Sequence, residues 1–281
     1  MAYAPRQSGA RNLMLPRLIS IGDSFYIPTY GVLVATAFLI GLWLAGRLGR
    51  RVGLDPEKIA NLAIYCTLSG FLGAKLMMFL FDWEKYAADP GSIFTIETLQ
   101  AAGVFHGGFL LALLVAVLYI RRNHMPVLTT MDVFAAPLAI AHAIGRLGCF
   151  AAGCCWGNVC ERPWAVTFRN PEANEVTGVP LGVPLHPTQL YESILGALIF
   201  LWLLRVFRRP HREGAVFGQY LVLYSVMRFS VEFLRHHDQP NPFDGPFSTI
   251  QWITLALAIL GLWLLRRRTS VVVPGPAAAK A

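Results

Sequence analysis

Residues 141–157 read AHAIGRLGCFAAGCCWG and join an apolar run to a long polar loop. The stretch contains four glycines, three cysteines and a single arginine, Arg146. A permanent charge among apolar residues is unfavourable unless a partner or a ligand neutralises it. The stretch therefore predicts a polar site at one end of an apolar segment.

The composition around this stretch is that of a membrane protein. Of the 281 residues, 55% are hydrophobic and only 14% are charged, whereas soluble domains contain roughly 25% charged residues. The first apolar run begins at Ile27 and no small-residue cleavage site follows it. We therefore expect this run to be a membrane span and not a cleaved signal peptide.

Seven apolar segments can be marked along the chain. Most of them reach the ~20 residues that cross the hydrocarbon core of a bilayer. They cover residues 27–46, 58–81, 104–120, 132–150, 188–207, 215–234 and 248–265. We predict an all-α polytopic membrane protein of about seven transmembrane helices over residues 27–266, with tails at 1–26 and 267–281 and a long loop at 151–187.

The charges of the connecting segments predict an orientation. The connections after the first, third, fifth and last segments, with the C-terminal tail, hold most of the 24 lysine and arginine residues. The positive-inside rule places these segments and the C-terminus in the cytoplasm, and the N-terminus and the loop 151–187 outside. Arg6, Arg11 and Arg17 of the N-terminal tail run against this but are outnumbered. Since topology accounts for the net charge of +8, we expect no nucleic-acid partner.

Polar side chains inside the spans converge on the outer half of the predicted bundle. Each charge near a helix centre costs about 2.5–3.5 kcal/mol on insertion scales, so such residues usually have a function. The second to sixth apolar segments each place polar side chains at this depth. In chain order these are Lys75; His106; His142, Arg146 and Cys149; His186, Gln189, Tyr191 and Glu192; and Tyr224, Arg228, Glu232 and Arg235. The last four lie within about 80° of one another on a helix.

Two interpretations of these charges stay open. In the structural one, Glu232 pairs with Arg228, Glu192 pairs with Arg146, and the pairs only hold helices together. In the functional one, the cations outnumber the carboxylates and bind an anion. Arginine is suited to bidentate phosphate binding, so a phospholipid head group is the simplest ligand.

The cysteines also leave alternatives open. Cys149, Cys154, Cys155 and Cys160 cluster at the predicted outer face, and Cys66 lies alone in the second segment. In an oxidising compartment we expect disulfides among the four. Their C-x4-C-C-x4-C spacing differs from the C-x2-C pairs of common zinc sites, so no metal is expected. A reactive thiol near Arg146 is the third interpretation, because a nearby cation lowers a thiol pKa.

Four motifs in this order resemble the prolipoprotein diacylglyceryl transferase family. They are HGG at 106–108, GRLG at 145–148, HPTQLYE at 186–192 and YSVMRFSVEFLR at 224–235. PTYG at 28–31 and STIQWITLALAILG at 248–261 are similar to the ends of the family's membrane domain. The resemblance extends from about residue 25 to 265.

The resemblance implies a bacterial inner-membrane transferase whose active site faces the extracytoplasmic side. Such an enzyme transfers diacylglyceryl from phosphatidylglycerol to the lipobox cysteine of a preprolipoprotein, the first step of lipoprotein maturation, without a cofactor. It implies that Arg146 and Arg228 hold the phosphate and that His106 is the base for the acceptor thiol. The remaining residues expected to bind substrate are Tyr30, Lys75, His186, Gln189, Tyr191, Glu192, Tyr224, Glu232 and Arg235.

The chain departs from the family pattern directly after Arg146. The family has two asparagines and an acid there, whereas this chain has Cys149, Ala152 and further cysteines. The departure leaves open a divergent transferase of the same fold with another lipid or acceptor. A lipid-binding membrane protein without catalytic activity is the remaining alternative.

Overall fold

The computed structural model describes residues 15–21, 25–95, 98, 103–236, 242 and 245–275. Arg6 and Arg11 of the N-terminal tail, and residues 276–281 of the C-terminal tail, lie outside these ranges. Within them the chain is predominantly helical, and its strands form only two-stranded antiparallel pairs.

Among the residues that the structure describes, six helices are long and apolar enough to cross a membrane. Each has at least 18 residues, or about 27 Å at 1.5 Å per residue, which matches the hydrocarbon core. The predicted all-α polytopic membrane fold is thereby confirmed. The six are α1 (Thr29–Arg51), α2 (Pro56–Phe81), α5 (Phe105–Arg122), α6 (Val127–Ala152), α8 (Thr188–Phe207) and α10 (Thr249–Arg266).

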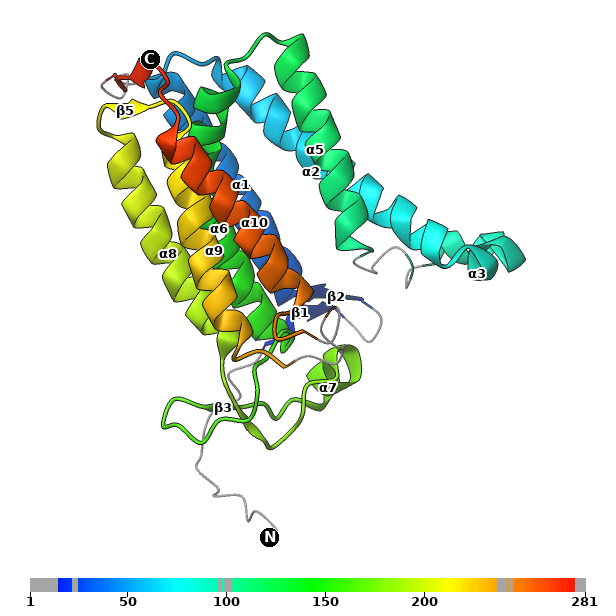
Figure 1. The fold of residues 1–281 in the computed structure, drawn as a ribbon. Coiled ribbons are helices and arrows are strands. Elements are labelled where there is room, and N and C mark those ends of the chain that lie inside the picture. The colour runs from blue at the N-terminus through cyan, green and yellow to red at the C-terminus, as the bar shows by residue number, and fades with distance from the viewer. Residues whose placement is uncertain are drawn as a thin grey trace. The chain divides into compact units, whose positions relative to one another are not determined.

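The remaining predicted span forms helix α9 (Ala215–Glu232), which is less apolar than these six. Its polar residues include Gln219, Arg228 and Glu232. The helix packs against α8 and α10 and buries both charged residues. Figure 1 shows α8, α9 and α10 running beside one another. The polar residues of α9 are thus part of the bundle interior.

The chain divides into two compact units. One contains residues up to Leu44 and Met131–Pro274, and therefore most of α6 together with α8, α9 and α10. The other contains Ala45–Thr130 and the segment from Gly275. It includes α2, α5, the short helix α3 (Trp83–Ala88) and the 3-10 helix η1 (Pro90–Phe94).

In the second unit, glycines let α2 and α5 pack closely. Gly107 and Gly108 of the HGG motif are buried. A Cβ atom on Gly108 would lie 2.7 Å from the carbonyl oxygen of Gly70, and one on Gly107 would overlap the backbone of Gly73. Small residues at such crossings are typical of membrane helices. These two glycines therefore serve helix packing.

The loop 151–187 of the first unit has its own folded core. It contains β3 (Val166–Thr167), α7 (Pro171–Thr177) and β4 (Pro184–Leu185), with β3 paired to β4. The Asn170 side chain caps α7, and Gly178 ends it in the left-handed conformation at φ +75°. The buried residues that hold this core together are Phe168, Ala173, Val179 and Leu185.

Two further strand pairs lie in segments that were expected to be plain tails or loops. Strands β1 (Arg17–Ile21) and β2 (Phe25–Pro28) pair just before α1. Strand β5 (His211–Arg212) pairs with β6 (Val271–Val272), which follows α10. The second pair ties the segment between α8 and α9 to the chain after α10.

A buried carboxylate anchors the start of α9 in the first unit. Asp132 of α6 is fully buried and accepts hydrogen bonds from the backbone N–H groups of Gly214 and Phe217, both at 2.7 Å. These N–H groups belong to the first turn of α9, where no intrahelical acceptor exists. A negative charge is also favourable at the positive end of the helix dipole.

We expect Asp132→Ala to lower the free energy of unfolding by about 2 kcal/mol, because it leaves two buried N–H groups without an acceptor. The melting temperature in detergent measures this loss. Glu161→Ala, which removes an exposed acid from the loop, is the control and should leave it unchanged. Equal melting temperatures for Asp132→Ala and the parent would contradict the capping role.

Candidate active site

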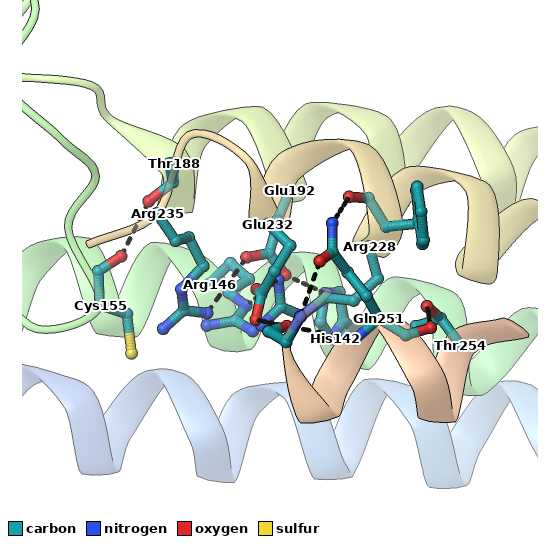
Figure 2. Close-up of polar contacts among 12 residues, drawn as sticks. His142, Arg146, Cys155, Thr188, Glu192, Arg228, Glu232, Arg235, Gln251 and Thr254 are labelled. Carbon is teal, nitrogen blue, oxygen red and sulfur yellow. Dashed lines mark hydrogen bonds and ion pairs between the residues drawn. The ribbon is translucent and has the colours of Figure 1, made fainter. Parts of the chain in front are cut away.

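The site is organised around the carboxylate of Glu192, whose side chain is only 1% exposed. Its Oε2 lies 2.9 Å from Nε of Arg146 and 3.2 Å from Nε2 of His142. Its Oε1 lies 3.7 Å from Nη1 of Arg235. Figure 2 shows these side chains converging on Glu192. The predicted pair of Glu192 with Arg146 is present, and two further groups join it.

Three elements supply this network. His142 and Arg146 lie one turn apart on α6, and Glu192 lies in the second turn of α8. Arg235 follows α9 and forms a β-bridge with Gly157. A Cβ on Gly157 would come within 2.7 Å of Cβ of His186. Glycine at this position therefore lets the bridge form and brings Arg235 to Glu192.

A second ion pair lies on α9. Arg228 and Glu232 pair one turn apart, as predicted, and are 8% and 3% exposed. Oε1 of Glu232 also accepts a hydrogen bond of 2.8 Å from the Ser248 hydroxyl. Ser248 forms a capping box with Gln251 at the start of α10. The pair thereby links the end of α9 to the start of α10.

Ser248 and Gln251 were missed as site residues by the sequence analysis. The amide of Gln251 donates to the carbonyl oxygen of Phe229 at 3.4 Å and is 3% exposed. The S-x-x-Q spacing just before an apolar run is a capping-box signature and would have identified the helix start. It would not have shown the bond to Glu232.

Two tyrosines lie against the helix that carries Arg146. The ring of Tyr224 packs edge-on against the His142 ring, with 5.4 Å between centroids. Tyr30, at the start of α1, is 45% exposed. A Cβ on Gly148 would lie 3.1 Å from its ring. Both residues therefore lie beside α6, and their role in substrate binding stays a prediction.

The HPTQLYE motif divides into two groups of contacts. Nδ1 of His186 lies 3.1 Å from the Tyr191 hydroxyl, which also accepts a hydrogen bond from Trp164. Gln189 instead donates to the carbonyl oxygen of Cys154 at 2.6 Å, and Thr188 donates to that of Cys155 at 2.8 Å. Trp164 and Thr188 were not predicted. The motif therefore holds the cysteine loop as well as the charged cluster.

The cysteines do not form the expected disulfides. All five are free thiols in the structure, so the prediction of a disulfide staple is wrong for this structure. The sulfur atoms of Cys149, Cys154 and Cys155 instead lie within 4.8 Å of one another. Cys160 is buried apart from this group.

Charge and hydrogen bonding distinguish the two adjacent thiols. Hydrogen bonds from the Cys149 and Cys154 thiols lower the pKa of Cys155, and the guanidinium groups of Arg235 and Arg146 lower it further. Hydrogen bonding to Cys149 and Cys155 raises the pKa of Cys154. The positive charge of the two guanidinium groups therefore favours the thiolate form of Cys155.

His106 and Lys75 lie in the second unit. His106 is near the start of α5, with its ring centroid 6.1 Å from that of Phe105. Nζ of Lys75 donates a hydrogen bond of 2.5 Å to the carbonyl oxygen of Thr98. These contacts are internal to that unit, so the roles of His106 as base and Lys75 as substrate ligand stay predictions.

In the first unit, the described cluster has more positive than negative charge. The guanidinium groups of Arg146, Arg228 and Arg235 face the carboxylates of Glu192 and Glu232. One positive charge is therefore left without a carboxylate. An anion bound beside these arginines would balance it.

Comparison with known proteins identifies the family. A family model described as prolipoprotein diacylglyceryl transferase matches residues 16–267. A protein of Clostridium tetani is 32% identical over 84% of this chain and 90% of its own length. Proteins of Symbiobacterium thermophilum and Solidesulfovibrio magneticus are each 35% identical over 90% of this chain and 93% and 94% of their own. All three are named phosphatidylglycerol–prolipoprotein diacylglyceryl transferase.

The matched region includes all six candidate membrane helices and the Glu192 network. The resemblance inferred from the four motifs is thereby confirmed. The chain belongs to the prolipoprotein diacylglyceryl transferase family.

Proposed function

We propose that the protein transfers the diacylglyceryl group of phosphatidylglycerol to the cysteine thiol of a prolipoprotein, the first step of lipoprotein maturation. The names of its relatives support the substrates. The observation that carries the proposal is the group of three buried or half-buried arginines around Glu192 and Glu232. This group has the charge and the donors to bind a phosphodiester head group.

The reaction makes two electrostatic demands. The acceptor sulfur attacks the glycerol carbon that bears the phosphate, so a C–S bond forms and the C–O bond to phosphate breaks. Glycerol phosphate leaves as an anion, and the thiol proton passes to a base. Cations are needed where the phosphate departs, and the attacking sulfur must be a thiolate.

Arg146 is suited to the departing phosphate. Its contact with Glu192 runs through Nε, and in this proposal its Nη groups donate to the phosphate. Glu192 also neutralises part of the charge in the absence of substrate. Arg228, held by Glu232, is the second phosphate ligand in this proposal.

Four further side chains contact the substrate in this proposal. Tyr30 and Tyr224, beside α6, line the lipid site, and His186 and Tyr191 form its mouth. His106 is the proposed base, since an imidazole can take a proton near neutral pH.

We further propose that the protein lies in the bacterial inner membrane with its active site toward the extracytoplasmic side. The last turns of α1, α5, α8 and α10 contain Arg51, Arg122, Arg205 and Arg266. The positive-inside rule places these helix ends in the cytoplasm. Arg146 and Glu192 lie toward the opposite ends of α6 and α8 from the cytoplasmic ends of those helices.

Arg146→Ala and Arg228→Ala should each reduce transfer at least about 100-fold, because each removes a cation from the departing phosphate. The assay uses purified protein, labelled phosphatidylglycerol and a lipobox peptide. Arg162→Ala, an exposed arginine of the loop, is the matched control and should retain activity. Full activity in both test variants would refute the phosphate-binding roles.

Glu192→Gln tests whether this carboxylate positions the arginines. The amide keeps the shape but loses the charge, so we expect a loss of about 3 kcal/mol in the free energy of unfolding and a more than tenfold fall in kcat. Glu192→Asp should restore part of both. A variant with normal kcat and lower stability would limit Glu192 to a structural role.

Complementation separates the usual substrates from other ones. The free thiols after Arg146 are the observation that favours a divergent transferase with another lipid or acceptor. The gene is expressed in a bacterium depleted of its own transferase. Restored growth with diacylglyceryl-modified lipoproteins is expected, and failure of an inserted, folded protein to restore them would favour the divergent enzyme.

A further inference from the structure

The three converging thiols have no part in the function described so far. Their sulfur atoms lie within 4.8 Å of one another. Thiolates around one tetrahedral zinc ion, with Zn–S bonds of about 2.3 Å, lie roughly 3.8 Å apart. Small side-chain rotations would therefore bring all three sulfurs to a single ion.

The backbone of the cysteine loop is held in place from α6 and α8. The Cys154 N–H donates to the carbonyl oxygen of Cys149 at 3.0 Å. The carbonyl oxygens of Cys154 and Cys155 accept the bonds from Gln189 and Thr188, two fully buried side chains. The backbone that carries the sulfur cluster is thus held by the first turn of α8, one turn before Glu192.

Cys155 adopts a backbone conformation that side-chain-bearing residues rarely occupy. Its φ is 62°, in the left-handed region. Such residues occur where the surrounding structure imposes them, often at functional sites. The thiols of the neighbours Cys154 and Cys155 lie on the same side here, whereas an extended backbone would direct neighbouring side chains to opposite sides.

The donor set favours a thiophilic ion with one coordination position left over. Thiolate ligands select zinc or copper(I) over hard cations. Among the residues that the structure describes, no fourth cysteine, histidine or acid joins the cluster. Structural zinc sites are closed by four protein ligands, and sites with three keep the fourth position for water or substrate.

We propose that Cys149, Cys154 and Cys155 bind Zn²⁺ as thiolates and that its open position takes the acceptor thiol. The binding site is inferred from the cluster alone, and it replaces our expectation from the cysteine spacing that no metal binds. Its use by the acceptor thiol rests on the proposed function.

Zinc would supply the nucleophile that the reaction needs. A thiol that coordinates zinc loses its proton, which passes to solvent or to a neighbouring base. The bound sulfur then attacks the glycerol carbon, the C–S bond forms, and the C–O bond to phosphate breaks. Glycerol phosphate leaves as the anion, and the neutral thioether is displaced from zinc by water. No oxidation or reduction occurs.

The position of the cluster fits this step. Arg235 and Arg146 lie within electrostatic reach of the Cys155 sulfur, and Figure 2 draws all three at the same end of the network. Arg146, which would receive the departing phosphate, and its neighbour Arg235 therefore lie beside the ion that would hold the attacking sulfur. The cysteines would also compensate for the amide and acid that this chain lacks after Arg146.

Metal binding is tested on the purified, reduced full-length protein in detergent. We expect one Zn²⁺ per chain after dialysis against zinc, and the visible absorption of tetrahedral cobalt thiolate with Co²⁺. Cys154→Ser and Cys155→Ser should each weaken Zn²⁺ binding at least tenfold. Cys66→Ser, which removes the isolated thiol of α2, is the matched control and should bind like the parent.

Metal binding by the parent protein tests the proposed site even if a serine variant fails to fold. If the reduced parent takes up neither Zn²⁺ nor Co²⁺, the metal site is overturned. It is equally overturned if the protein as isolated has a disulfide among the three cysteines and its reduction gives no metal binding. Zinc binding by the parent that survives in Cys155→Ser would overturn the assigned ligands.

Activity tests the use of the open position. Removal of zinc by a chelator should reduce transfer to the lipobox peptide at least tenfold, and added Zn²⁺ should restore it. Equal transfer rates for the zinc-bound and zinc-free forms would overturn the proposal that zinc binds the acceptor thiol. They would not affect the proposal that the three cysteines bind zinc. If neither form transfers lipid to the peptide, the proposed function fails, and the metal content alone decides the site.

Discussion

A buried carboxylate among apolar helices is the constraint on which the site depends. Glu192 is 1% exposed, and an unpaired charge at such a position is several kcal/mol less stable than in water. The chain meets this constraint with Arg146 and His142 from α6 and Arg235 from the segment after α9. These contacts join α6, α8 and the segment after α9 at a single carboxylate.

Lipid makes this kind of constraint more important than it is in a soluble protein. Apolar side chains gain little by packing on one another when the surrounding solvent is hydrocarbon, so polar contacts and close packing of small residues fix helix positions. The Glu232–Ser248 bond and the Asp132 cap act in this way at two other helix ends. Arg146 and Arg228, which bind the phosphate in our proposal, also form ion pairs within the first unit.

The sequence was sufficient for the helices and for the pairing of charges, and insufficient for the cysteine loop. Long apolar runs set the spans, and α8 begins and ends where predicted. The Arg228–Glu232 pair follows from helical spacing alone. The thiol cluster depends instead on bonds from Thr188 and Gln189 to carbonyl oxygens 33 and 35 residues away, and on the φ of Cys155. The spacing of cysteines in a sequence does not predict such long-range contacts. From the spacing and the expected oxidising compartment we therefore predicted disulfides.

The two halves of the proposed reaction need opposite electrostatic surroundings within a few ångströms. The departing phosphate needs positive charge, whereas a thiolate nucleophile beside unscreened arginines would form a stable ion pair and react slowly. Glu192 removes part of the positive field by binding Arg146 and Arg235 on one side. A zinc ion bound by three thiolates would hold the attacking sulfur apart from the arginines. The arginines would then remain available to bind the phosphate. On this argument, the cysteines after Arg146 change how the sulfur is activated and leave the phosphate site as it is.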